Sequence, residues 1–355
     1  MDDDVLMARL LDHVSAAEHR ENLVNNGYTV IDNALEDDHA RALHDEMLSF
    51  EKAGDFQPNQ VQFTIPGRSQ PIIATKPGIF EIDLHNAEKR KKAPHFDALF
   101  NGNAFVTALQ PVEATLHSRK LESGTESQQS VRLQPGVNGK TIKLQLNRGG
   151  AFPIHYDNPG RPNRRRWTCL VYLNPNWVEG DGGEVVLLPF GENSAGISVA
   201  PKFNRLLIFR SDLVLHRVMT ATRPRYCFTV WVDAHADDIN RDHDVLLKQK
   251  HLSLPIPKLV QLMRKSPLQR VISRAVYADT YKESLLMCIH GRDQSQPAEG
   301  SPADALAKPG SRYMLAAHQA QVKSLMNNAA LSDILLKLKT LVDSRSGSDE
   351  GAEQL

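Results

Sequence analysis

The sequence predicts an all-β core in the middle of the chain, flanked by helices on both sides. Between residues 141 and 234, short runs of β-branched, aromatic and leucine residues are separated by Gly, Pro and Asn, a pattern typical of strands joined by turns. On either side, apolar residues recur with the spacing of amphipathic helices. We therefore expect helices, a strand and a loop at 1–136 that buttress the core, the core itself at 137–236, and a helical extension at 237–355.

The N-terminal part contains a predicted helix at about 15–26, a strand with the sequence YTVI, and a second helix at about 37–52. Asp37 or Asp38 is a suitable N-cap for the second helix, because a short acidic side chain accepts hydrogen bonds from the first free amides. An apolar stripe along that helix is formed by Ala40, Leu43 and Met47. Such helices usually buttress the outer face of a sheet.

The most informative motif of the core is a His-x-Asp tripeptide with a later His and Arg. The tripeptide alone is weak, because about one is expected by chance, and three occur, beginning at His95, His155 and His235. His155 and Asp157 follow a predicted strand, on which residues i and i+2 face the same side and can share an ion. His95 enters a predicted short helix, where i and i+2 diverge, and His235 has no strand-borne histidine after it.

His216 and Arg225 complete the pattern on later strands. Two imidazoles and one carboxylate can hold one face of an iron(II) ion and leave its other positions open. A planar guanidinium grips a carboxylate with two parallel hydrogen bonds and stays charged when buried, so Arg225 in an apolar strand predicts a bound anion. Arg217 and Arg223 are expected to face water or a protein carboxylate.

With these motifs the chain resembles the iron(II)- and 2-oxoglutarate-dependent dioxygenases. Within them it resembles the prolyl 4-hydroxylase branch, in particular the hypoxia-inducible-factor prolyl hydroxylases and their microbial relatives. The resemblance spans about residues 20–236 and is dense from 141 to 236. It is carried by NGYTVIDNALEDDHARALHDEM, HYDNPG, TCLVYLNPNW, GDGGEVVLLPF, APKFNRLLIFRSD and HRVMTATRPRYCFTVW. It implies a double-stranded β-helix, in which two antiparallel sheets form a jelly roll around the metal.

The resemblance also implies the chemistry. His155, Asp157 and His216 match the iron(II) ligands, and 2-oxoglutarate and O2 are the implied co-substrates, with ascorbate as reductant. The expected reaction is hydroxylation with release of succinate and CO2. A related halogenase needs a small residue in place of the aspartate to admit a halide, so Asp157 argues for hydroxylation.

Four further residues match positions around the co-substrate. Arg225 matches the arginine that pairs with the distal carboxylate of 2-oxoglutarate, and Tyr172 matches a hydroxyl on the same carboxylate. Thr229, on the strand of Arg225, matches a further position facing the co-substrate. Gln145 stands where the family often has a tyrosine, so this side of the pocket is expected to be roomier.

Two polar loops are candidates for contact with a substrate. The 110–140 stretch is rich in turn residues and is expected to be a mobile loop that closes over substrate or a plain insert. Arginines crowd the 161–166 loop, which we expect near the pocket mouth. It suits an acidic peptide, a phosphorylated partner or nucleic acid, or is simply solvated; arginines without interleaved aromatics are weak evidence for nucleic acid.

The C-terminal extension reads as short helices after about residue 250, a linker at about 291–311, a long amphipathic helix at 313–343 and a disordered tail. The long helix either packs on the core of this chain or offers a contact to a partner or a second copy. The family resemblance does not reach this region.

Composition narrows the setting. The chain has 42 basic and 42 acidic residues, so no overall field favours nucleic acid, and no run of 18 apolar residues suggests a membrane span. The start MDDDVLMARLL lacks the pattern of a secretory signal. The three cysteines are scattered, which favours a reducing compartment. We expect a cytoplasmic or nuclear protein.

The expected substrate is a prolyl residue of a cytosolic or nuclear protein, because peptide hydroxylases need an open groove and the two polar loops favour a macromolecule. One alternative keeps the chemistry but acts on a small metabolite or a nucleobase. Another is a non-catalytic jelly-roll scaffold that acts through its C-terminal helices. The presence of all four key residues in the right order argues against a scaffold.

Overall fold

Two antiparallel sheets form the centre of the protein. The computed structural model describes residues 3–63, 72–122, 131–241, 249–290 and 309–346. Within these residues, seven strands form the larger sheet, in the order β1-β9-β6-β11-β4-β3-β2, and four form the smaller sheet, in the order β5-β10-β7-β8. The strands of the larger sheet are β1 (Tyr28–Ile31), β2 (Gln57–Phe63), β3 (Ile72–Asp83), β4 (Lys140–Asn147), β6 (Arg165–Tyr172), β9 (Arg205–Arg210) and β11 (Arg225–Asp233). Those of the smaller sheet are β5 (Phe152–His155), β7 (Val185–Leu188), β8 (Ile197–Val199) and β10 (Leu215–Val218).

The strands from β4 to β11 are divided between the two sheets, with β4, β6, β9 and β11 in the larger and β5, β7, β8 and β10 in the smaller, and form a double-stranded β-helix. The predicted jelly-roll core between flanking helices is therefore confirmed. Three more strands from the N-terminal region extend the larger sheet, and the sequence had predicted only β1. The β2–β3 hairpin was not predicted because β3 contains Pro77 and Gly78, a pair that usually indicates a turn.

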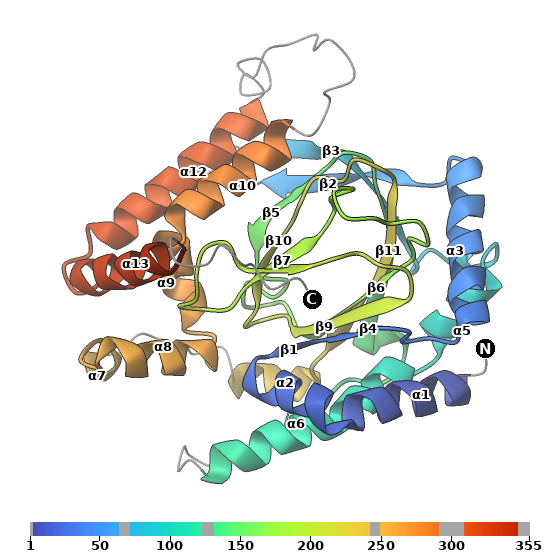
Figure 1. Cartoon of the computed structure of the whole chain (residues 1–355), viewed down its shortest axis with the longest axis horizontal. Helices are drawn as coiled ribbons and strands as arrows, with labels where there is room; N and C mark the ends of the chain where they lie inside the picture. Colours follow the sequence, from blue (N-terminus) through green and yellow to red (C-terminus); the bar gives the residue numbers. More distant parts are fainter. Residues whose placement is uncertain (1–2, 64–71, 123–130, 242–248, 291–308, 347–355) are drawn as a thin grey trace.

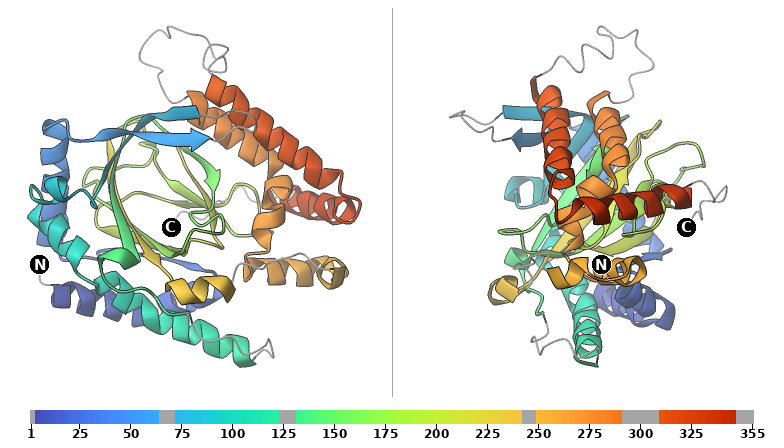
Figure 2. Two further views of the ribbon diagram at one scale, coloured as in Figure 1. Left: turned by 180° about the vertical axis from the view of Figure 1, so that it is seen from behind. Right: turned by 90° about the vertical axis from the view of Figure 1, so that its left-hand side faces the viewer.

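The N-terminal helices cover the outer face of the larger sheet (Figure 2). They are α1 (Asp3–Ser15), α2 (Ala17–Asn25), α3 (Asp37–Lys52), α4 (Ala87–Arg90), α5 (Pro94–Asn101) and α6 (Ala104–Glu122). The helix predicted at 37–52 forms as α3, and its expected apolar stripe is fully buried. Its N-cap is Glu36, which makes no side-chain capping bond, so the prediction of Asp37 or Asp38 as the cap was wrong.

The 110–140 stretch is not a single loop, contrary to the prediction. α6 continues to Glu122, and 123–130 lies outside the described residues. The helix buries Ala108, Leu109 and Val112 against the sheet. Its buried apolar residues fall mostly in its first half, so the polar second half lacked a helical pattern.

The C-terminal helices cover the outer face of the smaller sheet (Figure 1). They are α7 (Gln249–Leu252), α8 (Ile256–Arg264), α9 (Gln269–Val276), α10 (Ala278–His290), α12 (Pro309–Met326) and α13 (Ser332–Ser346), and the 3₁₀ helix η2 (Ala236–Arg241) precedes them in the chain. No helix among the described residues has the length and apolar character needed to cross a membrane. Most of the predicted linker, 291–308, and the tail, 347–355, lie outside the described residues.

The predicted single helix at 313–343 is two helices, α12 and α13. The chain breaks at Asn327 and Asn328, and the Asn328 side chain accepts a hydrogen bond from the amide of Ala330 at 3.0 Å. Asparagine competes with helical hydrogen bonding in this way. Part of the predicted apolar face packs on this chain, since Leu335 and Leu338 are buried and Leu325 and Met326 lie against the same cluster.

A third apolar cluster fills the space between the two sheets. It includes Leu170, Val185, Leu207, Phe209 and Val218. At one end this inner layer opens into a cavity of about 260 Å³. The two sheets therefore supply opposite walls of one pocket.

The packing of α13 on its own protein is testable with two neighbouring leucines. Leu335 is fully buried, whereas Leu336 is 57% exposed. We expect Leu335→Ala to lower the free energy of unfolding by about 2 to 5 kcal/mol, because it leaves a cavity in a packed cluster. Leu336→Ala should change it by less than about 0.5 kcal/mol. Urea denaturation of both variants measures this, and equal effects would show that α13 does not pack as described.

Candidate metal centre and co-substrate pocket

The two histidines of the motif meet across a pair of short strands. β5 and β10 pair antiparallel with His155 opposite His216, and their ring centroids lie 4.3 Å apart. In each ring Nδ1 contacts a backbone carbonyl two residues earlier, that of Pro153 at 2.7 Å and that of Val214 at 3.1 Å. These contacts assign the proton to Nδ1 and leave both Nε2 atoms free as metal ligands.

Asp157 lies just beyond the end of β5, and the larger sheet fixes its orientation. Its Oδ2 accepts hydrogen bonds from the Thr168 hydroxyl at 2.7 Å and the Trp231 indole at 2.9 Å. Its Oδ1 faces the two imidazoles, 3.4 Å from His155 Nε2 and 3.8 Å from His216 Nε2. One oxygen is thus held by the protein and the other is free for a metal.

The protonation states suit metal binding. Burial alone would raise the pKa of Asp157, but the nearby His216 and His155 and the Trp231 hydrogen bond outweigh it and lower that pKa. Burial lowers the pKa of His216 to about 4. A carboxylate and a neutral imidazole are the forms that bind metals.

The three ligand atoms fit one ion. They lie within 4.8 Å of one another, and among the described residues they are the cluster of His, Cys, Asp and Glu that could hold a metal. When a metal ion forms two bonds of about 2.1 Å at a right angle, the two ligand atoms lie about 3 Å apart. The distances of 3.4 and 3.8 Å from Asp157 Oδ1 to the two Nε2 atoms are close to this value. Two imidazoles and one carboxylate, open on the other side, form the facial triad typical of non-haem iron(II).

The inner face of the larger sheet forms a grid of side chains opposite the triad. Strand β11 pairs with β6 on one side and β4 on the other. The row farthest from Asp157 contains Tyr172, Cys227 and Gln145, the next contains Leu170, Thr229 and Lys143, and the nearest contains Thr168 and Trp231. The residues predicted at the co-substrate therefore share one face and lead away from the metal site.

Arg225 lies at the deep end of this grid as a buried cation without a carboxylate partner. Its side chain is 3% exposed. Its Nη1 contacts Cys227 Sγ at 3.1 Å, whereas its Nε and Nη2 have no hydrogen-bond partner in the described part of the protein. The hydroxyl of Tyr172, over whose ring the guanidinium lies at 5.1 Å, is unpartnered as well.

This orphaned pair fits an anionic ligand. A buried guanidinium without a partner is costly, and a carboxylate satisfies it with two charge-assisted hydrogen bonds. Burial raises the pKa of Tyr172 although Arg225 opposes this shift, so the phenol keeps the proton that it would donate. Arg217 and Arg223 instead lie near protein carboxylates, as predicted.

The guanidinium needs a glycine beside it. Gly183 has φ of +80°, and a Cβ there would lie 2.6 Å from Cδ of Arg225. Any side chain would both strain this backbone and displace the arginine. The GDGGEVV segment thus leaves room for Arg225.

Thr229 and Gln145 both line the cavity. Thr229 is buried, with 3% of its surface exposed. The Oε1 atom of Gln145 lies 3.5 Å from Cys227 Sγ. An amide thus faces the cavity beside the arginine, at the place where the sequence predicted a roomier wall.

The other two His-x-Asp pairs do not form metal sites. His95 begins α5 and contacts Glu46 through Nδ1 at 2.9 Å. His235 pairs with Asp237 at 3.3 Å, and no third ligand joins either pair among the described residues. The choice of His155 by strand context agrees with this geometry.

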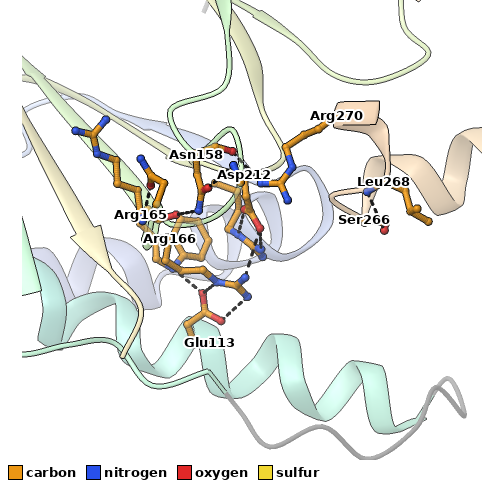
Figure 3. Close-up of polar contacts among 12 residues, drawn as sticks. Glu113, Asn158, Arg165, Arg166, Asp212, Ser266, Leu268 and Arg270 are labelled. Carbon is orange, nitrogen blue, oxygen red and sulfur yellow. Dashed lines mark hydrogen bonds and ion pairs between the residues drawn. The ribbon is translucent and has the colours of Figure 1, made fainter. Parts of the chain in front are cut away.

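The arginines of the 161–166 loop have different surroundings, and two of them pair with carboxylates of this chain. Arg166 forms two hydrogen bonds with Glu113, at 2.7 and 2.9 Å, and lies 3.5 Å from Asp212. Arg164 pairs with Asp233 at 3.6 Å. Figure 3 shows Arg165 turned away from this network; it lines the cavity.

Sequence reasoning missed the residues that hold Asp157. Thr168 and Trp231 carry no motif, but a signal was present. Thr168 lies four residues before Tyr172, and Trp231 six residues after Arg225, so strand alternation places each on the pocket face. Extending the i, i+2 rule along both strands would have found them.

Comparison with known proteins agrees with this geometry. Residues 142–233 match the model of the 2OG-Fe(II) oxygenase superfamily. A crystal structure of prolyl 4-hydroxylases from Phytophthora capsici is similar over 94% of both chains, with 33% identity and a TM-score of 0.71. The chain belongs to the 2OG-Fe(II) oxygenase superfamily. It is a prolyl 4-hydroxylase-like 2-oxoglutarate-dependent dioxygenase, and the family and the triad together imply iron(II) and 2-oxoglutarate.

Two groups of curated relatives match the core of this dioxygenase. Rat Egl nine homolog 1 is 36% identical over 100 residues, which are 27% of this chain and 29% of the relative. Mouse prolyl hydroxylase EGLN3 is 39% identical over 85 residues, 23% and 35% of the two chains. The chain thus spans about a third of the length of these relatives.

Trp231→Phe tests how Asp157 is held. The substitution keeps an aromatic ring but removes the indole donor, so Asp157 can turn away from the metal. We expect metal affinity to fall by roughly 10- to 100-fold, as for other groups that orient a ligand. Calorimetric titration of the metal-free enzyme with cobalt(II) measures it.

The matched control is Trp177→Phe, which removes an indole hydrogen bond to Gly182 O outside the metal site. It should leave cobalt affinity unchanged. Unchanged affinity in Trp231→Phe would contradict the role given to this indole.

Proposed function

We propose that this dioxygenase hydroxylates a prolyl residue of a protein or peptide, with iron(II), 2-oxoglutarate and O2 and with release of succinate and CO2. One observation carries the proposal. A single cavity contains both an open facial triad and, deeper, a buried guanidinium without a counter-charge. A metal alone would not require the second feature, and a simple anion site would not require the first.

Residues at one end of the cavity would bind the metal, and residues at the other end would bind the distal carboxylate of 2-oxoglutarate. His155, Asp157 and His216 would hold iron(II), which when bound supplies the oxidising chemistry between O2 and 2-oxoglutarate. Arg225 and Tyr172 would bind the distal carboxylate, the first through two parallel hydrogen bonds and the second through its protonated hydroxyl.

Between these two ends, Thr229 and Gln145 would contact the body of the co-substrate. Both line the cavity on the face that carries Arg225. Both are uncharged hydrogen-bonding side chains, so they would help to orient the co-substrate.

The size of the cavity supports a substrate that inserts one small side chain. Its volume of about 260 Å³ is below the roughly 300 to 1,000 Å³ typical of small-molecule sites, and 2-oxoglutarate must occupy part of it. A large metabolite or a nucleobase therefore has little room. The walls near the metal include Leu170, Val185 and Val218, which suit an apolar ring such as that of proline.

Similarity to proteins described as prolyl hydroxylases supports the same substrate class. Ascorbate as reductant and a cytoplasmic or nuclear location remain predictions from the sequence. The free, buried thiols of Cys169, Cys227 and Cys288 favour a reducing compartment.

Arg225→Ala tests the co-substrate site. Removing the guanidinium removes two charge-assisted hydrogen bonds worth about 1.5 to 3 kcal/mol each, so we expect 2-oxoglutarate to bind at least about 100-fold more weakly, while cobalt(II) binds as before. Arg223→Ala, two residues away on an exposed side chain paired with Asp181, is the matched control and should bind both normally. Equal 2-oxoglutarate affinity in the two variants, measured by calorimetry, would exclude this role for Arg225.

Peptide mass spectrometry tests the whole proposal. Cells expressing the wild type are compared with cells expressing Asp157→Ala, which lacks one metal ligand. We expect prolyl peptides that gain the mass of one oxygen atom only with the wild type. Asp237→Ala, from the His-x-Asp pair that forms no metal site, should behave as wild type. If the enzyme converts 2-oxoglutarate to succinate but no such peptide exists, the metabolite alternative gains support.

A further inference from the structure

The segment that carries two of the three iron ligands begins as a short strand at a sheet edge. β5 has four residues, and among the described strands it pairs with β10 alone, with an irregular register near His216. An edge strand leaves one row of backbone groups without sheet partners. Asp157 lies beyond its end, where no ladder holds the backbone. Contacts from outside the sheet are therefore needed to hold the backbone of residues 154–158.

The C-terminal helices supply that support at alternate residues. The amide of Ile154, on the free edge, donates to the Ser284 hydroxyl of α10 at 3.0 Å. The hydroxyl of Tyr156 donates to Oε1 of Gln269, at the start of α9, at 2.9 Å. These two residues flank His155, so the extension holds the chain on both sides of the first ligand.

A third contact follows the second ligand. Arg270 Nη1 donates to the carbonyl of Asn158 at 2.8 Å, and Figure 3 shows this side chain reaching from α9 toward the loop. The amide of Asn158 in turn donates to Ser211 O at 2.9 Å. The peptide after Asp157 is thus fixed from the helical side and from the core.

The segment 154–158 lies between the C-terminal extension and the cavity. The backbone of residues 154 and 158 and the hydroxyl of Tyr156 bind the extension, while the side chains of His155 and Asp157 line the cavity, as does part of Tyr156. Two polar partners in the extension, Gln269 and Ser284, are each 1% exposed. Their remaining groups are also satisfied, because Gln269 donates to Met263 O and Ser284 donates to Tyr281 O.

We propose that Ser284, Gln269 and Arg270 are positioning residues of the iron site. Through them α9 and α10 hold the segment 154–158 in place, so that metal affinity depends on these three contacts. Because such coupling is reciprocal, metal binding also stabilises the docked helices. The inference rests on the triad and not on the identity of the substrate.

Cobalt(II) titration of the metal-free, full-length protein tests this positioning role. Ser284→Ala leaves the buried Ile154 amide without a partner, which costs more than the hydrogen bond contributes. We expect its cobalt affinity to fall at least about 10-fold, in the range found for groups that support metal ligands. Ser284→Thr keeps the hydroxyl and should recover most of the affinity. Arg270→Gln, at a part-buried contact, should weaken binding in the same direction.

The control is Tyr277→Phe, which also removes a buried hydroxyl between extension and core. That hydroxyl bonds to Gly191 and Pro189, outside β5. Its cobalt affinity should equal that of the wild type. Similar losses in Tyr277→Phe and Ser284→Ala, or wild-type affinity in both Ser284→Ala and Arg270→Gln, would overturn the proposal.

Hydrogen exchange gives a second readout that leaves the contacts between the extension and residues 154–158 unaltered. Cobalt(II) added to the wild-type protein should slow amide exchange in α9 and α10, and Asp157→Ala should abolish this protection. Protection confined to β5 and β10, with α9 and α10 unchanged, would show that the helices are not coupled to the metal. Neither readout depends on a prolyl substrate, so failure of this positioning role and failure of the proposed function are distinguishable.

Discussion

The site depends on one buried carboxylate that is held by a sheet other than its own. Asp157 follows a strand of the smaller sheet, yet its Oδ2 is fixed by Thr168 and Trp231 of the larger sheet. The two histidines that complete the triad belong to the smaller sheet. The triad therefore exists only when both sheets are packed, and the core between them is a condition for chemistry as well as for stability. The buried charge is tolerated because Thr168 and Trp231 donate hydrogen bonds to it.

The pocket contains two groups that lack binding partners, the open facial triad and the buried guanidinium, and one small dicarboxylic acid can bind both. The triad leaves coordination positions open, and Arg225 lacks a counter-charge at the deep end. Both features are costly in the empty protein and favourable once ligands bind, as is common where binding sites are formed in advance. Gly183 leaves room for the Arg225 side chain, since a larger residue would displace the arginine.

The sequence was sufficient for the triad because strand alternation is a local rule: His155 and Asp157 share a face whatever surrounds them. The same rule, carried further, reaches Thr168 and Trp231. It does not reach Gln269, whose contact with Tyr156 joins residues more than 100 positions apart and leaves no periodic trace. Strand β3 was also not predicted, because Pro77 within it indicates a turn. The strand forms there only because it pairs with its neighbours in the folded protein. Local patterns thus predicted the ligands, whereas tertiary contacts determine what holds them.

A crystal structure of the protein prepared without oxygen, with manganese(II) and 2-oxoglutarate, tests the central claim most directly. The account predicts the metal bound by Nε2 of His155, Nε2 of His216 and Oδ1 of Asp157, with 2-oxoglutarate chelating it and its distal carboxylate against Arg225. A metal bound elsewhere, or a 2-oxoglutarate whose distal carboxylate leaves Arg225 without a partner, would contradict it.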